Sequence, residues 1–219
     1  MSDSKIEKVV YLVRHGESEH NTAPVFQSPD SPLSKKGQMQ AENVSNRISH
    51  LSFEVLISST LQRAKETAEI ISRKTNVLPE HSDLFRESVA PTKISGKSYE
   101  DNEASIIWHR WEDSLYASGL RVEDGENFDD LMIRAEKALK YLKDRPEKAI
   151  VVITHGFFLR TLIAKVLLGD LLTGETFKMI QRAASSENTG LSVLRYQTGF
   201  EEGYDWRLWT YNDHAHLAE

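Results

Sequence analysis

The chain has 219 residues and a formal net charge of −6. This acidic balance argues against an extended basic surface for nucleic acid or anionic membrane, so any bound anion must be held by a local cluster. Cysteine is absent, which excludes disulfides, thiolate chemistry and cysteine-ligated zinc. Residues 1–8 are polar and no apolar run is long enough to span a bilayer, so we expect a cytoplasmic protein with neither nucleic-acid nor membrane partners.

Three short apolar runs, at residues 9–13, 53–57 and 149–153, each stop at polar residues. They are rich in β-branched residues and lack polar alternation, as in strands buried on both faces. The first stops at Arg14-His15-Gly16 and the last at Thr154-His155-Gly156. Strands that end in polar turns and lead into helices or loops predict an α/β sheet whose strand ends present ligand groups.

Amphipathic and apolar patterns predict the helices between these strands. One follows Ser34, which can cap it, and buries Ala41, Val44, Ile48 and Leu51; others cover about 61–74, 128–142 and 157–168. A short strand is expected near 77–80. Two late strands, 191–196 and 206–210, precede a polar tail over 212–219.

Residues 85–125 are charged and aromatic, and we interpret them as a cap inserted into a single domain that covers residues 1–219. A helix is expected from about 102 to 117. Trp108 and Trp111 lie on this helix and are expected to form its packing face, although either side chain could instead cover the substrate pocket.

The two His-Gly pairs lie 140 positions apart, yet each ends a buried strand. A histidine in that place has a fixed backbone and a ring that reaches beyond the sheet, and the glycine lets a ligand approach the backbone closely. A single histidine after a strand is more often structural. The second pair in the same context favours one shared site that contains His15 and His155.

Arg63 is predicted in the first turn of a helix that follows a strand. A guanidinium near the positive end of a helix is unfavourable unless an anion bridges them. Taken alone, Arg63 would be an ordinary surface arginine. Together with Arg14 it supplies two planar forks that suit phosphate oxygens.

Three motifs resemble those of the histidine phosphatase superfamily, which includes the phosphoglycerate mutase-like proteins. The resemblance is to the phosphatase branch in particular. They are Leu12-Val-Arg-His-Gly-Glu-Ser18 with Asn21, the stretch from Ser58 to Ala68 (SSTLQRAKETA), and Ile153-Thr-His-Gly156. The resemblance extends from residue 8 to about 214 and is weakest in the cap. It implies a three-layer α/β/α sandwich around a mostly parallel sheet, with a small inserted helical cap.

The resemblance makes His15 the nucleophile that becomes a phosphohistidine, and Arg14, Arg63 and His155 the clamp around the transferring phosphoryl group. The physical chemistry agrees, because a histidine must be neutral to attack and neighbouring positive charges favour its neutral form. The same charges stabilise the transition state of phosphoryl transfer. Neither a metal nor another cofactor is expected, and the partner is a small phosphorylated substrate.

The leaving oxygen needs a proton, so a carboxylic acid is expected near the substrate. Glu87, at the start of the cap, matches the family's acid. Asp124 and Glu126 compete for this role, although a loop followed by a helix N-terminus explains both.

The substrate-binding residues are expected to include Asn21, Thr22, Ser59 and Gly156; for Asn21 and Ser59 a turn or cap role is equally compatible with the sequence. His20 could line the entrance of the site. His214 and His216 could hold a metal, yet no third ligand accompanies them and solvent exposure is the simpler expectation.

Two other functions stay open. A phosphoglycerate mutase-type phosphotransferase is disfavoured because the segments 26–33 and 85–89 depart from the mutase pattern. A phospho-ligand-binding module without activity would not need the nucleophile, the clamp and the acid together. Hydrolysis of small phosphomonoesters is therefore the favoured reaction, and the sequence identifies neither the ester nor the oligomeric state.

Overall fold

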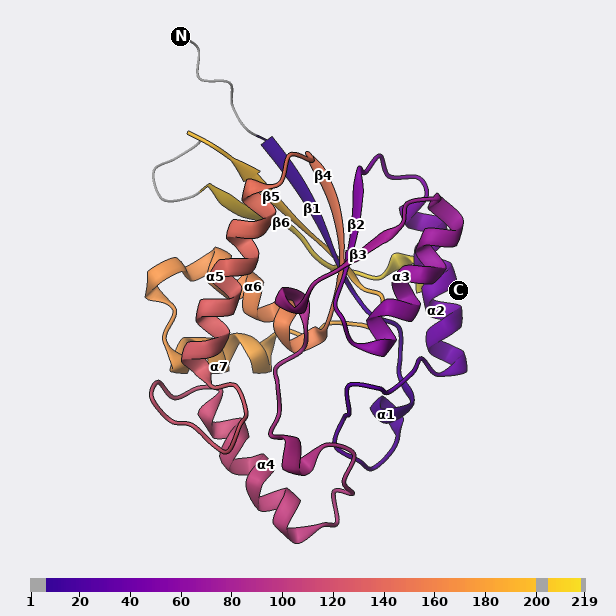
Figure 1. The fold of residues 1–219 in the computed structure, drawn as a ribbon. Helices are drawn as coiled ribbons and strands as arrows, with labels where there is room; N and C mark the ends of the chain where they lie inside the picture. Colours follow the sequence, from indigo (N-terminus) through magenta and orange to yellow (C-terminus); the bar gives the residue numbers. More distant parts are fainter. Residues whose placement is uncertain (1–6, 200–204, 218–219) are drawn as a thin grey trace.

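The computed structural model describes residues 7–199 and 205–217. Six strands form one sheet in the order β3-β2-β4-β1-β5-β6 (Figure 1). Their bounds are Glu7–Arg14 (β1), Val55–Ser58 (β2), Pro79–His81 (β3), Ala149–Thr154 (β4), Leu191–Gln197 (β5) and Trp206–Asp213 (β6). Strands β1 to β4 are parallel, while β5 is antiparallel to both β1 and β6. The predicted α/β fold with a mostly parallel sheet is confirmed.

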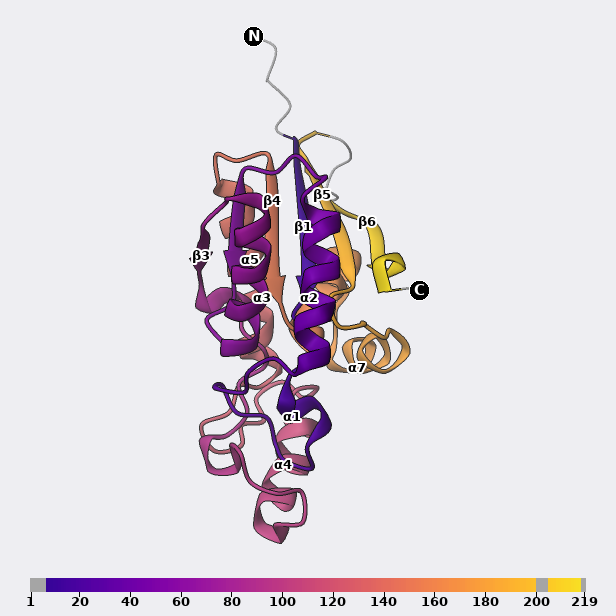
Figure 2. The same cartoon turned by 90° about the vertical axis from the view of Figure 1, so that its right-hand side faces the viewer.

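Helices cover both faces of this sheet, which makes three layers (Figures 1 and 2). They are α1 (Glu19–Thr22), α2 (Lys35–Ile48), α3 (Gln62–Thr75), α4 (Asn102–Ser114), α5 (Phe128–Asp144), α6 (Gly156–Leu168) and α7 (Gly174–Ala183). Buried side chains of α2 and α3 pack on one face, and those of α5 and α6 on the other. No helix within residues 7–199 and 205–217 is both long and apolar enough to cross a bilayer.

Strand β1 shows why the apolar run at residues 9–13 belongs in the centre of the sheet. Val10 and Leu12 belong to the core beneath α5 and α6, whereas Val13 belongs to the core beneath α2 and α3. All three side chains are fully buried. Since successive side chains of a strand point to opposite faces, only a strand covered on both sides can bury neighbours such as Leu12 and Val13.

Several predicted bounds need correction. Strand β2 begins at Val55, two residues later than expected, and β3 covers Pro79–His81, displaced toward the C-terminus. The tail expected from residue 212 begins later, because β6 continues through Asp213, which pairs with Leu191 of β5. No element is predicted for residues 169–190, where α7 lies with Thr173 as its cap. The turn between β5 and β6 includes residues 200–204, outside the described range.

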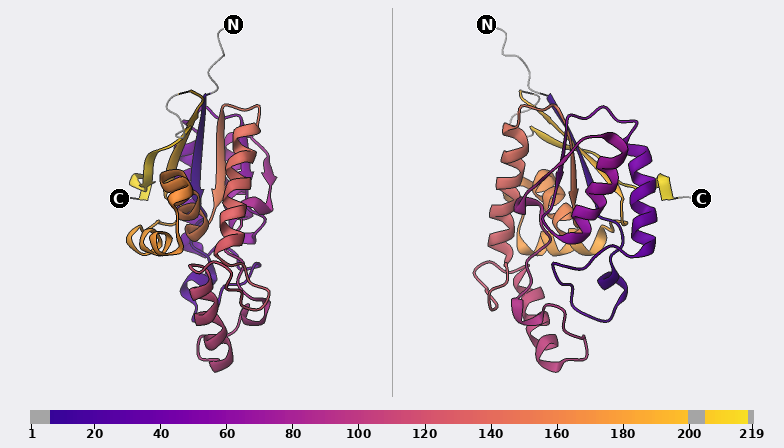
Figure 3. Two further views of the ribbon diagram at one scale, coloured as in Figure 1. Left: turned by 90° about the vertical axis from the view of Figure 1, so that its left-hand side faces the viewer. Right: turned by 45° about the vertical axis from the view of Figure 1, so that its right-hand side comes forward.

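The segment between β3 and α5, where the cap is expected, lies beyond the carboxyl ends of β1, β2 and β4 (Figures 1 and 3). Helix α4 is its main element and ends at Ser114, three residues earlier than expected. Trp111 is 2% exposed and donates its indole N–H to the Glu126 carbonyl at 2.8 Å. This tryptophan therefore ties α4 to the chain just before α5.

Two glycines let the loop after β1 lie directly against the first turn of α2. A Cβ on Gly37 would lie 1.9 Å from the Glu17 carbonyl oxygen, and one on Gly16 would lie 2.4 Å from the Gly37 carbonyl oxygen. Real Cβ atoms do not approach backbone oxygens so closely. The close contact holds the loop that follows His15 against α2.

The Gly37→Ala variant is therefore expected to lower the free energy of unfolding by about 1–3 kcal/mol through steric overlap. At an unconstrained helix position the same change would instead add about 1 kcal/mol. Urea unfolding followed by circular dichroism measures the sign. Gln38→Ala, at the next and exposed position of α2, is the control and is expected to stay within about 0.5 kcal/mol of the wild type. A more stable Gly37→Ala protein would contradict the close packing.

Candidate active site

The neighbouring positions of β1 and β4 bring the two His-Gly pairs together. Arg14 pairs with Thr154 in the sheet, and the backbone N–H of His15 donates to the Thr154 carbonyl at 2.9 Å. The rings of His15 and His155 consequently lie with their centroids 4.8 Å apart. One buried site thus contains both imidazoles, at the carboxyl ends of parallel strands.

Hydrogen bonds define which nitrogen of His15 can act. Nδ1 lies 2.6 Å from the Gly16 carbonyl oxygen, which can only accept, so Nδ1 carries the proton. Nε2 then bears the lone pair and accepts from Nε of Arg63 at 3.1 Å. Nε2 is therefore the ring nitrogen of His15 that bears a lone pair on the Arg63 side.

The surroundings keep His15 neutral. Burial is the largest cause, and the positive charges of Arg63 and then Arg14 add to it, so that the pKa of His15 lies well below its ordinary value of 6.5. The ring is 2% exposed. A neutral imidazole with a free lone pair is the form that attacks phosphorus.

His155 is completely buried and is also held neutral, since burial and then Arg63 and His15 lower its pKa well below the ordinary value. Its Nε2 lies 2.7 Å from Oγ of Ser59. Ser59 comes directly after β2, the strand next to β4, and is itself fully buried. The structure thus places Ser59 behind His155, where it orients the ring.

Two buried polar atoms at the site lack a hydrogen-bond partner among the described residues, namely Nδ1 of His155 and Nε of Arg14. Such atoms are costly unless something binds them. Arg14 donates through Nη1 to the Ser186 carbonyl. A Cβ on Gly156 would lie 3.2 Å from Nε of Arg14, so glycine leaves room for this guanidinium. A hydrogen-bond acceptor such as a phosphate oxygen would satisfy the Nε–H of Arg14.

Arg63 is the second residue of α3, as predicted, and is only 2% exposed. Burial lowers its pKa to about 10, against the opposing charge of Glu87. Besides His15 it contacts the Ser28 carbonyl, to which Nη1 donates at 3.3 Å. A guanidinium buried at a helix start, without a carboxylate in the described ion pairs, is an arrangement suited to an anion.

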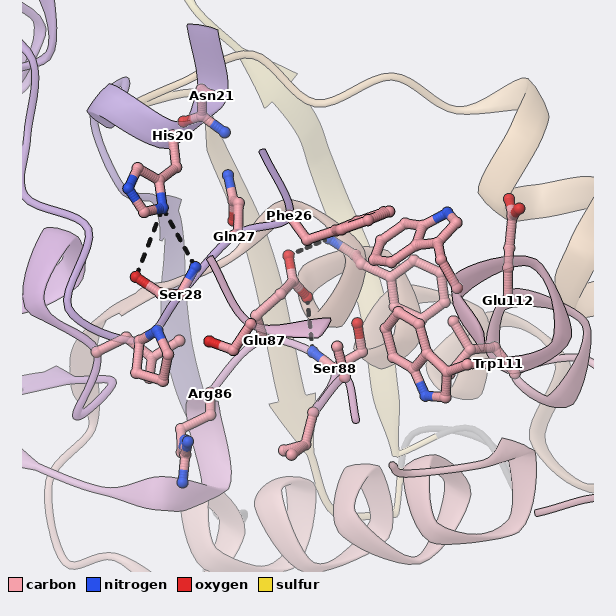
Figure 4. A pocket seen from close by; sticks show the side chains of 18 of the residues that line it. His20, Asn21, Phe26, Gln27, Ser28, Arg86, Glu87, Ser88, Trp111 and Glu112 are labelled. Carbon is pink, nitrogen blue, oxygen red and sulfur yellow. Dashed lines mark hydrogen bonds between the residues drawn. The ribbon is translucent and has the colours of Figure 1, made fainter. Parts of the chain in front are cut away.

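A cavity of about 620 Å³ opens beside these residues and is lined by Arg63 and Glu87, among others (Figure 4). In this view Glu87 lies in the middle of the lining, with His20 on one side and Phe26 and Trp111 on the other. The Glu87 carboxylate accepts the backbone N–H groups of Phe157 and Phe158 at 3.2 and 3.0 Å. Helix α6 therefore anchors Glu87 next to His155, its N-cap residue.

The two competing carboxylates do not line the cavity. Glu126 forms an ion pair with Arg134, with 2.7 Å between Oε1 and Nε, and accepts the Val89 N–H. Asp124 accepts the backbone N–H of Thr92 at 2.9 Å. Both carboxylates hold the chain around Glu87, which leaves Glu87 as the carboxylate of the three that faces the cavity.

The other predicted residues are placed as follows. Asn21 lines the cavity, but its Oδ1 accepts from the Ser18 N–H at 2.9 Å, so part of its amide serves the cap of α1. His20 also lines the cavity and accepts the Ser28 N–H through Nδ1. The side chain of Thr22 lies outside the described part of the structure.

Sequence reasoning missed residues of the loop before β5. Oγ of Ser186 accepts from Arg160 at 2.8 Å, and its carbonyl accepts from Arg14. Asn188 donates through Nδ2 to the His15 carbonyl at 2.9 Å. These residues follow no strand and form no motif, and only the β1–β5 pairing brings them beside His15. Arg160 in α6 carried a signal, since it lies one turn after the second His-Gly pair.

Within the described part of the chain, the two C-terminal histidines lack a third metal ligand. His216 is not simply solvent-exposed: it is half-buried and lies against Oγ1 of Thr189 (3.1 Å) and Nη1 of Arg47 (3.4 Å). His214 is exposed and contacts the Asn212 carbonyl. Across residues 7–199 and 205–217, no group of three or more histidines and carboxylates could hold a metal ion.

Known proteins share this architecture. The probable phosphoglycerate mutase GpmB of Escherichia coli is 30% identical over 213 residues, which cover 95% of this chain and 94% of that protein. Among solved structures, Bacillus stearothermophilus YhfR matches with a TM-score of 0.78 at 25% identity, covering 96% of this chain and 99% of that one. The alpha-ribazole phosphatase from Shigella flexneri, at 20% identity, has the same fold, with a TM-score of 0.77 and coverage of 94% and 96%.

A family model matches nearly the whole chain. It is that of the histidine phosphatase superfamily (branch 1), and it covers residues 10–213. The resemblance seen in the three motifs is confirmed. The chain belongs to the histidine phosphatase superfamily, whose members are phosphatases or mutases, and its paired histidines adjoin Arg63 and Glu87 of the cavity lining.

Proposed function

We propose that this protein is a metal-independent phosphatase that hydrolyses phosphomonoesters in two steps, through a phosphohistidine at His15. The observation that carries the proposal is the state of His15. Its Nδ1–H is committed to the Gly16 carbonyl, its Nε2 lone pair faces Arg63, and its pKa is lowered by burial and by adjacent arginines. A merely structural histidine has no need for this combination.

In the first step, Nε2 of His15 attacks phosphorus, the N–P bond forms and the P–O bond to the alcohol breaks. Arg14, Arg63 and His155 surround the non-bridging oxygens and stabilise their charge. Glu87, protonated in the substrate complex, gives its proton to the leaving oxygen. Its position on the wall of the cavity supports this role.

In the second step, water attacks the phosphohistidine and the N–P bond breaks. Glu87, now a carboxylate, takes a proton from this water, and the electron pair of the N–P bond returns to Nε2. Inorganic phosphate leaves and Glu87 is again protonated. The arginines supply the charge stabilisation that a metal ion provides in other phosphatases.

The name of the relative GpmB favours a second candidate, phosphoryl transfer between phosphoglycerates. Two features favour hydrolysis of a different ester over phosphoglycerate interconversion. The segments 26–33 and 85–89 depart from the mutase pattern, and the cavity of about 620 Å³ accepts an alcohol much larger than glycerate. A rate of phosphoglycerate interconversion well above the rate of hydrolysis would reverse this order.

The His15→Ala variant is expected to lose at least about 10³-fold in kcat on 4-nitrophenyl phosphate, because the covalent route disappears. The wild-type enzyme should keep its activity in a chelator and yield an acid-labile phosphoprotein on rapid quenching. His109→Ala, on the exposed side of α4, is the control and should retain full activity. Unchanged turnover by His15→Ala, or strict dependence on added metal, would refute the mechanism.

The Glu87→Gln variant should affect esters according to their leaving group. The side-chain amide of this variant cannot give a proton to the leaving oxygen, so kcat should fall by about 10²–10⁴-fold for an alkyl phosphate. The loss should be much smaller for 4-nitrophenyl phosphate, whose leaving group needs no proton. Glu103→Gln, an exposed position in the first turn of α4, serves as the control. Equal losses on both esters would assign Glu87 a structural role instead.

The charge state of His15 can be measured directly. In protein with labelled histidine rings, the wild-type His15 should stay neutral as the pH falls through 6.5, because burial and Arg63 lower its pKa. Arg63→Gln removes one positive charge, so its His15 should gain a proton at a higher pH than in the wild type. Arg73→Gln, exposed on the same helix, should leave the titration unchanged. Wild-type titration near 6.5 would contradict a neutral nucleophile.

A further inference from the structure

The cavity is basic in an otherwise acidic chain. Four arginines and two glutamates line it, although the net charge of the whole chain is −6. Arg63 serves His15, and Arg86 lies 3.6 Å from the carboxylate of Asp83. The other two arginines, Arg160 and Arg182, have no carboxylate within ion-pair distance among the described residues.

Arg160 is held in one orientation. Its Nε donates to Oε1 of Gln181 at 2.7 Å, and its Nη1 donates to Oγ of Ser186 at 2.8 Å. Gln181 is 8% exposed and donates in turn to the Phe157 carbonyl at 3.1 Å. A guanidinium positioned by buried partners has already lost much of its side-chain entropy. The entropic cost of binding an anion to it is therefore smaller.

Tyr116 connects the two arginines. Burial and then the negative charge of Glu112 raise the pKa of Tyr116, and the positive charges of Arg160 and Arg182 oppose them, so both arginines and Glu112 lie near the Tyr116 ring. Among the described residues its hydroxyl has no hydrogen-bond partner, and it lines the same cavity. We call Tyr116, Arg160, Gln181 and Arg182 the arginine wall.

Aromatic rings form one part of the remaining lining. Phe26 stacks on Trp108, with ring centroids 4.9 Å apart, and Trp108 meets Trp111 edge to face at 5.0 Å. These rings join the loop after α1 to α4 and, with Phe157, line the same cavity as the arginine wall. Such a surface suits the carbon skeleton of a ligand, while the charged groups define its orientation.

Building on the proposed hydrolysis at His15, we propose that the substrate carries a second anionic group on its alcohol portion, and that the arginine wall binds it. The second group is a carboxylate, a phosphate or a phosphonate. The guanidinium groups of Arg160 and Arg182 pair with it, and the Tyr116 hydroxyl donates a hydrogen bond to it. The apolar part of the alcohol lies against the aromatic rings. The substrate class is thus a phosphomonoester of an alcohol that is apolar in its middle and negatively charged at its far end.

Alternatively, Arg160 positions Arg14 through Ser186, which accepts hydrogen bonds from both side chains. The two readings predict different kinetics. A support for Arg14 affects every phosphomonoester equally, whereas a second anion site affects only esters that carry a second charge.

The test uses 4-carboxyphenyl phosphate and its uncharged isostere 4-carbamoylphenyl phosphate. The wild type is expected to prefer the carboxylate by about tenfold or more in kcat/KM. Arg160→Gln and Arg182→Gln should each reduce that preference, and the double variant should abolish it, mainly through KM. A third ester, 4-(phosphonomethyl)phenyl phosphate, distinguishes a carboxylate from a phosphate-like second group by which of the two is preferred more strongly. Arg110→Gln, exposed on α4 and outside the cavity lining, should keep the wild-type preference.

The proposal is overturned if the wild type shows no preference, or if Arg160→Gln slows both isosteres equally. Calorimetric binding of the same two esters to His15→Ala repeats the comparison without turnover. If His15→Ala binds the carboxylate ester more tightly but the wild type hydrolyses neither ester, the proposed reaction is refuted and the arginine wall stands. If the wild type hydrolyses both isosteres at equal kcat/KM, the arginine wall is refuted and the proposed reaction stands.

Discussion

The pairing of β1 with β4 is the constraint on which the site depends. It sets the backbone of His15 against that of Thr154 and brings two imidazoles to a centroid distance of 4.8 Å. Two rings so close in a buried place repel each other if both are protonated, and Arg14 and Arg63 add further positive charge. The neutral state of His15 thus follows from packing that the sheet imposes.

Burial without an anion is costly for the arginines as well. The pKa values of Arg14 and Arg63 are both lowered, with burial as the first cause. Positive charge that the fold holds in place before substrate arrives needs little reorganisation during the reaction, and this is the main source of electrostatic catalysis. In the proposed mechanism, the cost to folding and the gain in catalysis thus come from the same contacts.

Helix α6 joins the chemistry to the cavity. Its N-cap is His155, and its first backbone N–H groups hold Glu87. One turn further lies Arg160 of the arginine wall. A single helix therefore sets the spacing between His155, Glu87 and Arg160, to which we assign the phosphate, the acid and the second anion site.

The sequence by itself determined the buried strands, most helices and the residues at the two strand ends, because hydrophobic periodicity and the His-Gly motifs are local signals. It also pointed to Arg63 through its place at a helix start. The tertiary structure alone decided that Ser59 supports His155 and that Ser186 and Asn188 support Arg14 and His15. It also chose among the carboxylates, since only the folded chain shows Glu126 paired with Arg134 and Glu87 facing the cavity. These contacts join positions far apart in the chain, and sheet register and helix packing, which no local pattern encodes, bring them together.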